Sequence, residues 1–275
     1  MKHSALFAVP LLAGVVAAAE PAFHAGPWLA LQSYEESVKI EDIKSDWQTA
    51  ALGLRASAGT GVGRGFDLAF QLNTGLSLTD TEEWISRGQT LQLNDADLWL
   101  IEGQARLERP WTSSDTVLTP GLAAEYRYQD FQRSKFRSRA TGLLGQVGSV
   151  DEELYLCFAG PTLELSRPLS PGTRVATRLT CLWLLDGEVR NSLIGSTLDA
   201  ESGRVTSLEL AWEREAAEDR AGWTISLFME HQSLKGTDRQ RLVARHSGEP
   251  VYEYVEWPDN VLDTIAIQVS RGFRF

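Results

Sequence analysis

Apolar residues occupy every second position in repeated segments of about ten residues, over most of the chain after residue 26. The segment 66–73, for example, reads FDLAFQLN. Successive side chains of a β-strand point to opposite faces, so this period produces strands with one apolar face and one polar face. The alternation predicts an all-β protein built from antiparallel strands.

Ten segments carry the pattern. Five are strongly patterned and lie at 66–73, 118–128, 207–213, 223–230 and 264–275; five more are expected near 27–34, 47–58, 91–107, 151–166 and 173–186. Short links rich in Gly, Pro or Ser alternate along the chain with longer polar links, which lie near 35–46, 79–90, 129–150, 187–203 and 233–261. Short periplasmic turns and long extracellular loops are typical of a transmembrane up-and-down β-barrel, so we expect that fold.

A chain with this hydropathy can cross a membrane only as a closed barrel. In lipid every backbone N–H and C=O needs a partner within the protein, and a closed sheet provides one. The outer face is then apolar and the inner face polar, which agrees with a mean hydropathy of −0.19. A secreted antiparallel sandwich also has period two and is the alternative.

Aromatic residues favour the barrel, because they gather at the expected strand ends and the chain holds nine Trp. Trp and Tyr are enriched at both interfaces of a membrane with water. One predicted belt, near the short turns, comprises Trp28, Phe66, Trp111, Trp212, Trp223, Phe273 and Phe275. The other, near the long loops, comprises Tyr34, Trp47, Trp84, Trp99, Tyr126, Tyr128, Tyr155 and Trp183.

Composition excludes several other classes of protein. The 275 residues carry 26 Lys and Arg against 37 Asp and Glu, and this net charge of −11 argues against nucleic acid as a partner. A hydrophobic content of 43% excludes a disordered chain. Two Cys are too few for a disulfide-rich scaffold, and no metal-ligand spacing is present, so we expect neither metal nor cofactor.

Residues 1–19 have the pattern of a secretory signal peptide. A basic start at Lys2 precedes an apolar run at 5–16, and three alanines lead to Glu20. The run is too short to anchor the chain as a transmembrane helix. We therefore expect cleavage after Ala19, export, and a mature barrel of residues 20–275; a buried N-terminal helix is the alternative.

The last segment carries the most specific motif. Phe275 ends the sequence, and Phe273, Val269, Ile267 and Ile265 continue the same face. This segment resembles the C-terminal strand of Gram-negative outer-membrane β-barrels. The resemblance implies a location in the cell outer membrane, contact with its lipid, and recognition of the strand ending in Phe275 by the barrel-assembly machinery.

Ten strands with five long loops also resemble the omptin-type barrels, which are proteases with a site at the extracellular rim. That resemblance implies an Asp pair and an Asp–His pair that activate water. The candidates in this sequence are Asp95, Asp97, Asp186 and His231. The Asp-x-His motif of that family is missing, so a rim protease is the less favoured hypothesis and solvated strand-end carboxylates are the alternative.

Charged residues of both signs fall on the predicted inward face. They are Arg55, Asp67, Glu102, Arg106, Glu125, Arg127, Glu164, Arg178, Glu209, Glu213, Glu230 and Arg274. A ten-stranded barrel is narrow, so we expect these side chains to fill it as paired charges, giving a structural or surface-interaction barrel without a catalytic site. A narrow channel that prefers cations is the alternative, because carboxylates are in excess.

Cys157 and Cys181 have their midpoint at residue 169, in the centre of the turn SRPLSPG. A regular hairpin would place them opposite each other and would pair Glu164 with Arg174. Two hypotheses remain open at this point: a cross-strand disulfide formed in the oxidising periplasm, or two small apolar residues packed side by side without a bond.

Four basic residues cluster in one expected loop. Arg133, Lys135, Arg137 and Arg139 lie at alternate positions of the link 129–150. Guanidinium and ammonium groups bind phosphate, so this cluster is the best candidate for binding lipopolysaccharide at the outer rim. A solvated loop is the alternative.

Overall fold

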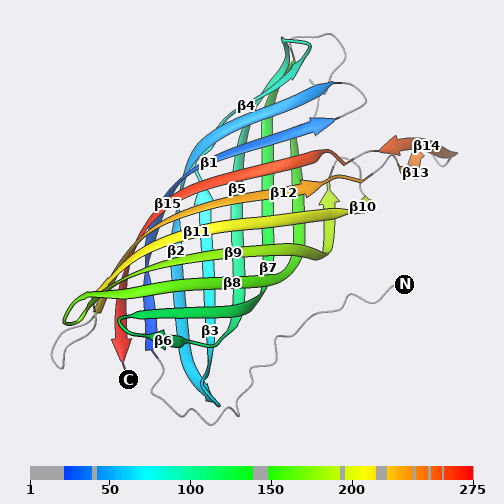
Figure 1. Cartoon of the computed structure of the whole chain (residues 1–275). Helices are drawn as coiled ribbons and strands as arrows, with labels where there is room; N and C mark the ends of the chain where they lie inside the picture. Colours follow the sequence, from blue (N-terminus) through cyan, green and yellow to red (C-terminus); the bar gives the residue numbers. More distant parts are fainter. Residues whose placement is uncertain are drawn as a thin grey trace.

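Ten antiparallel strands close into a barrel, as predicted (Figure 1). The computed structural model describes residues 22–38, 42–138, 148–192, 196–214, 222–237, 240–246, 249–255 and 257–274. The wall strands are β1 (Ala22–Val38), β2 (Ile43–Gly63), β3 (Phe66–Ser77), β5 (Gln89–Glu108), β7 (Thr116–Ser138), β8 (Ser149–Ser170), β9 (Thr173–Asn191), β11 (Ser202–Arg214), β12 (Gly222–Lys235) and β15 (Asp259–Arg274). The first and last strands close the wall, with Leu29 paired to Ile267.

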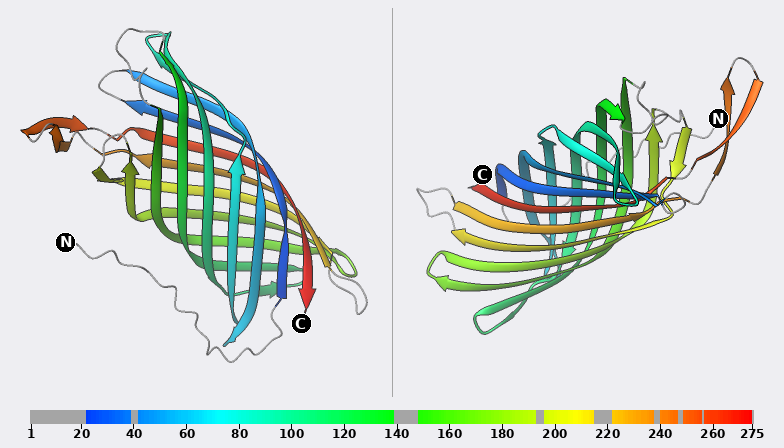
Figure 2. Two further views of the ribbon diagram at one scale, coloured as in Figure 1. Left: turned by 180° about the vertical axis from the view of Figure 1, so that it is seen from behind. Right: turned by 90° about the horizontal axis from the view of Figure 1, so that it is seen from above.

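Short strands extend this wall. They are β4 (Asp80–Ser86), which lies between β2 and β5 beyond the end of β3, β6 (Trp111–Ser113) beside β7, and β10 (Ser196–Asp199) beside β9. The hairpin of β13 (Gln240–His246) and β14 (Glu249–Val255) projects away from the barrel (Figure 2). No helix in the described part of the chain is long and apolar enough to cross a membrane.

The strands continue far into the segments that the sequence predicted as loops. Most of 35–46 belongs to β1 and β2, and β7 continues to Ser138 through the first part of 129–150. A transmembrane strand needs only about 9–11 residues, whereas β7 has 23. The wall therefore extends well beyond the length that lipid can cover.

The outer face carries the lipid-like surface. Leu29, Leu31 and Leu185 are 63–71% exposed, which is unusual for leucine in a folded protein unless lipid or a partner covers it. On β7 the outward residues are apolar up to Tyr128, and the next outward residues are Asp130 and Gln132. The outer surface thus changes from apolar to polar part-way along the strand.

Aromatic residues mark both borders of the apolar band, although not all the predicted ones do. At one border the rings of Trp99 and Tyr128 lie 5.5 Å apart, and those of Tyr128 and Tyr155 lie 5.1 Å apart. Trp111 and Trp223 are exposed at the other. The prediction was right for these residues, and it was wrong for the inward-facing Trp28, Tyr34, Trp47 and Trp84.

Glycines explain why Trp28 lies inside the barrel. The register places Trp28 beside Gly53, and Gly53 beside Gly75. A β-carbon at Gly53 would lie 2.5 Å from the indole ring, and one at Gly75 would lie 2.3 Å from it. The two glycines therefore make the slot that the ring occupies. Tyr34 and Trp47 face inward with Phe131, because the alternation of β1 and β2 continues past the predicted strand ends.

The two cysteines do not lie opposite each other as a regular hairpin would place them, and both are free in the structure. The strand pair β8–β9 matches Thr162 with Thr180 and Glu164 with Arg178, which places the turn two residues later than the sequence midpoint. A register shift next to Cys157 then brings Asp186 opposite it. The strand pairing centres the hairpin on residue 171, within an irregular turn at 168–173, and not on residue 169. This later turn and the shift beside Cys157 together place the two cysteines out of register.

This register makes a chemical prediction. Denatured, unreduced protein should contain two titratable thiols per chain, measured with a chromogenic thiol reagent. The double variant Thr162→Cys/Thr180→Cys places two further thiols at positions that do pair, and it should lose those thiols to a disulfide on mild oxidation. Absence of free thiols in the wild-type protein would show that the register is the one predicted from the sequence.

Candidate functional site

An arginine near mid-height crosses the lumen and joins opposite walls. Arg127 projects from β7, and its Nη1 and Nη2 donate to Oε1 and Oε2 of Glu230 on β12, at 2.6 and 2.8 Å. Its Nε donates to Glu125, and Nη1 lies 3.3 Å from Glu102 Oε1. The side chain is 1% exposed. A two-pronged guanidinium–carboxylate pair fixes both distance and orientation, so it holds β7 and β12 at a set separation.

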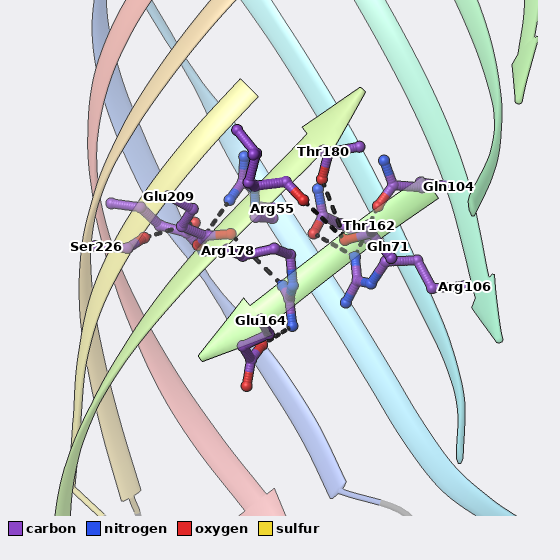
Figure 3. A network of polar contacts seen from close by, with 12 residues as sticks. Arg55, Gln71, Gln104, Arg106, Thr162, Glu164, Arg178, Thr180, Glu209 and Ser226 are labelled. Atoms are coloured by element: carbon purple, nitrogen blue, oxygen red, sulfur yellow. Dashed lines mark hydrogen bonds and ion pairs between the residues drawn. The ribbon is translucent and has the colours of Figure 1, made fainter. Parts of the chain in front are cut away.

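A second group of arginines lies closer to the short turns (Figure 3). Arg55 on β2 donates to Glu209 on β11 at 3.3 Å and to Asn73 at 2.8 Å. Glu209 also lies 3.6 Å from Arg178 of β9, which donates in turn to Glu164. The predicted partner of Glu164 was Arg174, which is wrong because the hairpin register places Arg178 opposite it.

Amide side chains connect the two groups. Arg106 donates to Glu108 at 2.9 Å and to Gln104 at 2.7 Å. Gln104 donates to Glu125, which accepts from Arg127. Glu108 also lies 4.0 Å from Arg178, and Asn73 donates to Glu102 at 3.0 Å, so the network runs from the short-turn side to mid-height. The prediction that inward charges pair is confirmed for Arg55, Glu102, Arg106, Glu125, Arg127, Glu164, Arg178, Glu209, Glu213 and Glu230.

A third arginine crosses the lumen near the other end. Arg133 of β7 donates to Glu36 of β1 and to Glu82 of β4, both at 2.8 Å. All three side chains are buried. The guanidinium lies 6.0 Å from the ring centre of Tyr34 and 5.7 Å from that of Trp84, within the range of cation–π attraction.

Apolar side chains fill the space around these polar groups. The buried apolar residues of the surrounding strands β1, β5, β8, β9, β11 and β15 include Trp28, Ala30, Leu100, Leu156, Phe158, Leu182, Val205 and Ala266, each less than 10% exposed. Two cavities inside the wall have volumes of only about 30 and 20 Å³. A larger one of about 240 Å³ lies on the short-turn side and is lined by His24, Arg174 and Glu213 among others.

The acidic protease candidates do not converge on the lumen. Asp95 and Asp97 lie on the outer side of β5, because they alternate along the strand in step with the outward-facing Trp99. Asp97 Oδ2 accepts a long hydrogen bond of 3.5 Å from Thr79. Asp186 is exposed opposite Cys157 on another part of the wall. Asp95 and Asp97 share strand β5, whereas Asp186 lies on β9 and is separated from them by β7 and β8, so the three carboxylates do not gather at one site.

His231 has a carboxylate partner that the sequence did not suggest. Its Nδ1 lies 2.7 Å from Asp263 Oδ1, on the outer side of the neighbouring strands β12 and β15. The pair is about half exposed. Within the described residues, no group of three or more His, Cys, Asp or Glu could hold a metal ion.

The predicted basic cluster is divided by the wall. Arg133 faces inward and is occupied by carboxylates, so the prediction that it binds lipopolysaccharide was wrong. A register shift in the β5–β7 pair turns Lys135 and Arg137 outward, where both bind Asp95, at 2.8 and 3.0 Å. Lys135 has a φ of 52°, which is typical of a bulge that redirects side chains. Arg139 lies outside the described residues.

Several interior residues escaped the sequence analysis. Glu36 and Glu82 were assigned to loops, and Gln232 was not singled out although it bonds both Arg127 and Gln129. The signal was available, because Gln32, Tyr34 and Glu36 continue the inward parity of Trp28. Polar residues on the buried face of a strand weaken the apolar pattern, and this caused the strands to be ended too early.

Comparison with known proteins supports the fold. The outer-membrane protease OmpT from Escherichia coli is similar over 92% of this chain and 97% of its own, with a TM-score of 0.64 and 7% identity. The translocator domain of the autotransporter NalP from Neisseria meningitidis has a TM-score of 0.41, with 12% identity over 94% of this chain and 89% of its own. The toluene transporter TodX from Pseudomonas putida has a TM-score of 0.38, with 11% identity over 93% and 90%.

No protein-family model matches the sequence, and no curated protein matches it. The likeness to OmpT therefore concerns the ten-stranded outer-membrane barrel fold and not its activity.

The substitution Arg127→Met tests the role of the crossing arginine. It leaves Glu102, Glu125 and Glu230 buried without their shared cation, so the free energy of unfolding should fall by about 3–5 kcal/mol. The measurement is urea unfolding in lipid vesicles, followed by tryptophan fluorescence. Lys135→Met, at an exposed ion pair, is the matched control and should change this quantity by less than about 1 kcal/mol. Equal effects of the two substitutions would refute the structural role of Arg127.

Proposed function

We propose that this protein is an integral outer-membrane β-barrel with a filled, non-conducting lumen, which serves as a structural or surface-interaction protein. The packing at the level of Arg127 carries the proposal. Arg127, Leu156 and Leu182 are at most 1% exposed, so water has no access to them. An ion path past this level would have to break the two-pronged bond to Glu230 and expose its carboxylate.

The outer surface has the dimensions of a membrane band. On β8 the outward face runs from Tyr155 to Arg167 through Leu163 and Leu165. These twelve residue steps span roughly 40 Å along the strand, or about 28 Å along the membrane normal at a tilt of about 45°. The apolar band of outer-membrane barrels is about 25 Å tall. The fit supports a transmembrane placement of the part between the aromatic borders.

Export and assembly belong to the same proposal, and they concern residues 1–19 and the strand β15. Residues 1–19 and Phe275 lie outside the described residues, so the signal peptide and the terminal contact remain proposals. The strand β15 supports the second of them, because Ile265, Ile267, Val269 and Phe273 all face outward and the strand closes the barrel against β1. We infer removal of the signal peptide and recognition of this strand by the barrel-assembly machinery.

Lipopolysaccharide is the surface partner that we propose, through Lys135 and Arg137. These side chains are 76% and 57% exposed, and they lie on the outer side of β7 beyond the aromatic border. Asp95 holds both of them but offers only one negative charge, so the group keeps a net positive charge that phosphates can bind.

The alternatives have less support. A rim protease would need carboxylates and a histidine gathered over one opening, whereas Asp95, Asp97 and His231 lie on the outer side of the wall. A narrow channel that prefers cations would need a continuous wet path, and the described lumen is packed at two levels, around Arg127 and around Arg133. Either alternative would be detected by the tests below.

Conductance in planar bilayers tests the filled lumen. The wild-type protein should give no steady single-channel current, whereas a known porin inserted in the same way gives open-channel steps. Heat-modifiable gel mobility of the same sample establishes that the protein is folded. Steady, cation-selective currents would support the channel alternative. Cleavage of a dibasic fluorogenic peptide, abolished by Asp97→Asn, would support the protease.

The variant Lys135→Gln/Arg137→Gln tests the lipopolysaccharide contact. Loss of two phosphate-binding cations should reduce the amount of lipopolysaccharide that copurifies with the protein, by about tenfold. The matched control is Lys44→Gln, which also removes an exposed cation from the outer side of the same end. Unchanged retention in the double variant would reject the proposed contact.

A further inference from the structure

Two arginines flank a tryptophan on the outer surface at the short-turn end of the barrel. The register pairs Trp223 of β12 with Arg214 of β11 on one side and with Arg271 of β15 on the other. All three side chains are exposed and share the outward parity of their strands. Strands lie about 4.8 Å apart, so the two arginine positions are about 10 Å apart along one row. This row is named the Arg214–Trp223–Arg271 row.

The positive charges of the row have no anionic partner within the described residues. Neither arginine takes part in an ion pair there, in contrast with the arginines of the lumen. The guanidinium of Arg271 instead lies over aromatic rings, 6.0 Å from the centre of Trp223 and 5.6 Å from that of Phe273. Stacking of this kind holds the guanidinium plane in place while its N–H donors remain available.

An apolar column begins directly above the row. The next row consists of Trp212, Ile225 and Val269, which pair across the same three strands. These side chains are 37–47% exposed on the outer face. Together the two rows provide what a membrane lipid needs: cations and an indole at headgroup depth, and a smooth apolar surface for acyl chains.

We propose that the Arg214–Trp223–Arg271 row binds the phosphate of an anionic phospholipid in the leaflet at the short-turn end. Each guanidinium can donate two parallel hydrogen bonds to phosphate oxygens. Two cations that have no ion-pair partner among the described residues favour a headgroup with net negative charge over a zwitterionic one. The assignment is separate from the filled lumen and depends only on insertion of the barrel in a membrane.

Native mass spectrometry of the full chain tests this proposal, with the protein in detergent micelles that contain equal amounts of phosphatidylglycerol and phosphatidylcholine. The wild-type protein should retain phosphatidylglycerol preferentially. In Arg214→Gln/Arg271→Gln the preference should fall by about tenfold, the size expected when charge-assisted hydrogen bonds are lost. The matched control is Arg204→Gln, an exposed arginine with the same outward parity at the opposite end of β11, and it should keep the wild-type preference.

Each other outcome overturns the proposal. Equal retention of both lipids by the wild-type protein would do so, as would a preference that survives in the double variant or is lost equally in Arg204→Gln. Loss of the preference in excess inorganic phosphate would identify a site for free anions instead. If the double variant does not show heat-modifiable mobility, the two single variants replace it.

Failure of the wild-type protein to enter vesicles would refute the membrane placement itself, a result distinct from loss of lipid preference.

Discussion

The barrel depends on one constraint: polar side chains inside a narrow wall must find their partners across the lumen. The side chains at mid-height are almost fully buried, so an unpaired charge there would be very costly. Arg127 satisfies three carboxylates from three strands, and Arg133 joins the first strand to the middle of the wall. The bonds from Arg127 to Glu230 and from Arg133 to Glu36 link strands that share no backbone hydrogen bonds. They therefore fix the cross-section of the barrel, which strand pairing alone leaves free to flatten.

The same constraint separates the inner surface of the barrel from the outer one. Inside, each of Arg55, Arg127 and Arg178 is matched by glutamates at bonding distance. On the outside, Arg214 and Arg271 are exposed next to aromatic rings and apolar residues. An arginine that is matched by protein carboxylates stabilises the fold, whereas one left at the edge of an apolar band is available for a ligand. Location on the wall thus decides whether the same side chain serves structure or binding.

The sequence predicted the wall well, because period two encodes which face each residue occupies. It predicted the inward arginines and glutamates for the same reason. The predictions from the sequence were wrong where the regular alternation of inward and outward residues is interrupted. The turn between β8 and β9 and the shift beside Cys157 change the register of the hairpin, so the cysteines do not meet. Arg133 keeps the inward alternation of β7, whereas the bulge at Lys135 turns Lys135 and Arg137 outward. No local pattern identifies either irregularity, since each arises from how two strands fit together.

Packing also fills the lumen where the strands extend past the apolar band. Where the strands extend past the apolar band, the inward positions hold Tyr34, Trp47 and Phe131, with Arg133 and its glutamates beside them. These side chains occupy the volume in which a substrate would have to lie. The charged residues of that region which remain exposed, such as Asp95 and Lys135, are turned to the outer side. Within the described residues, the interior at that end is therefore filled with the residues that hold the barrel together, and the exposed charges lie on its outer side.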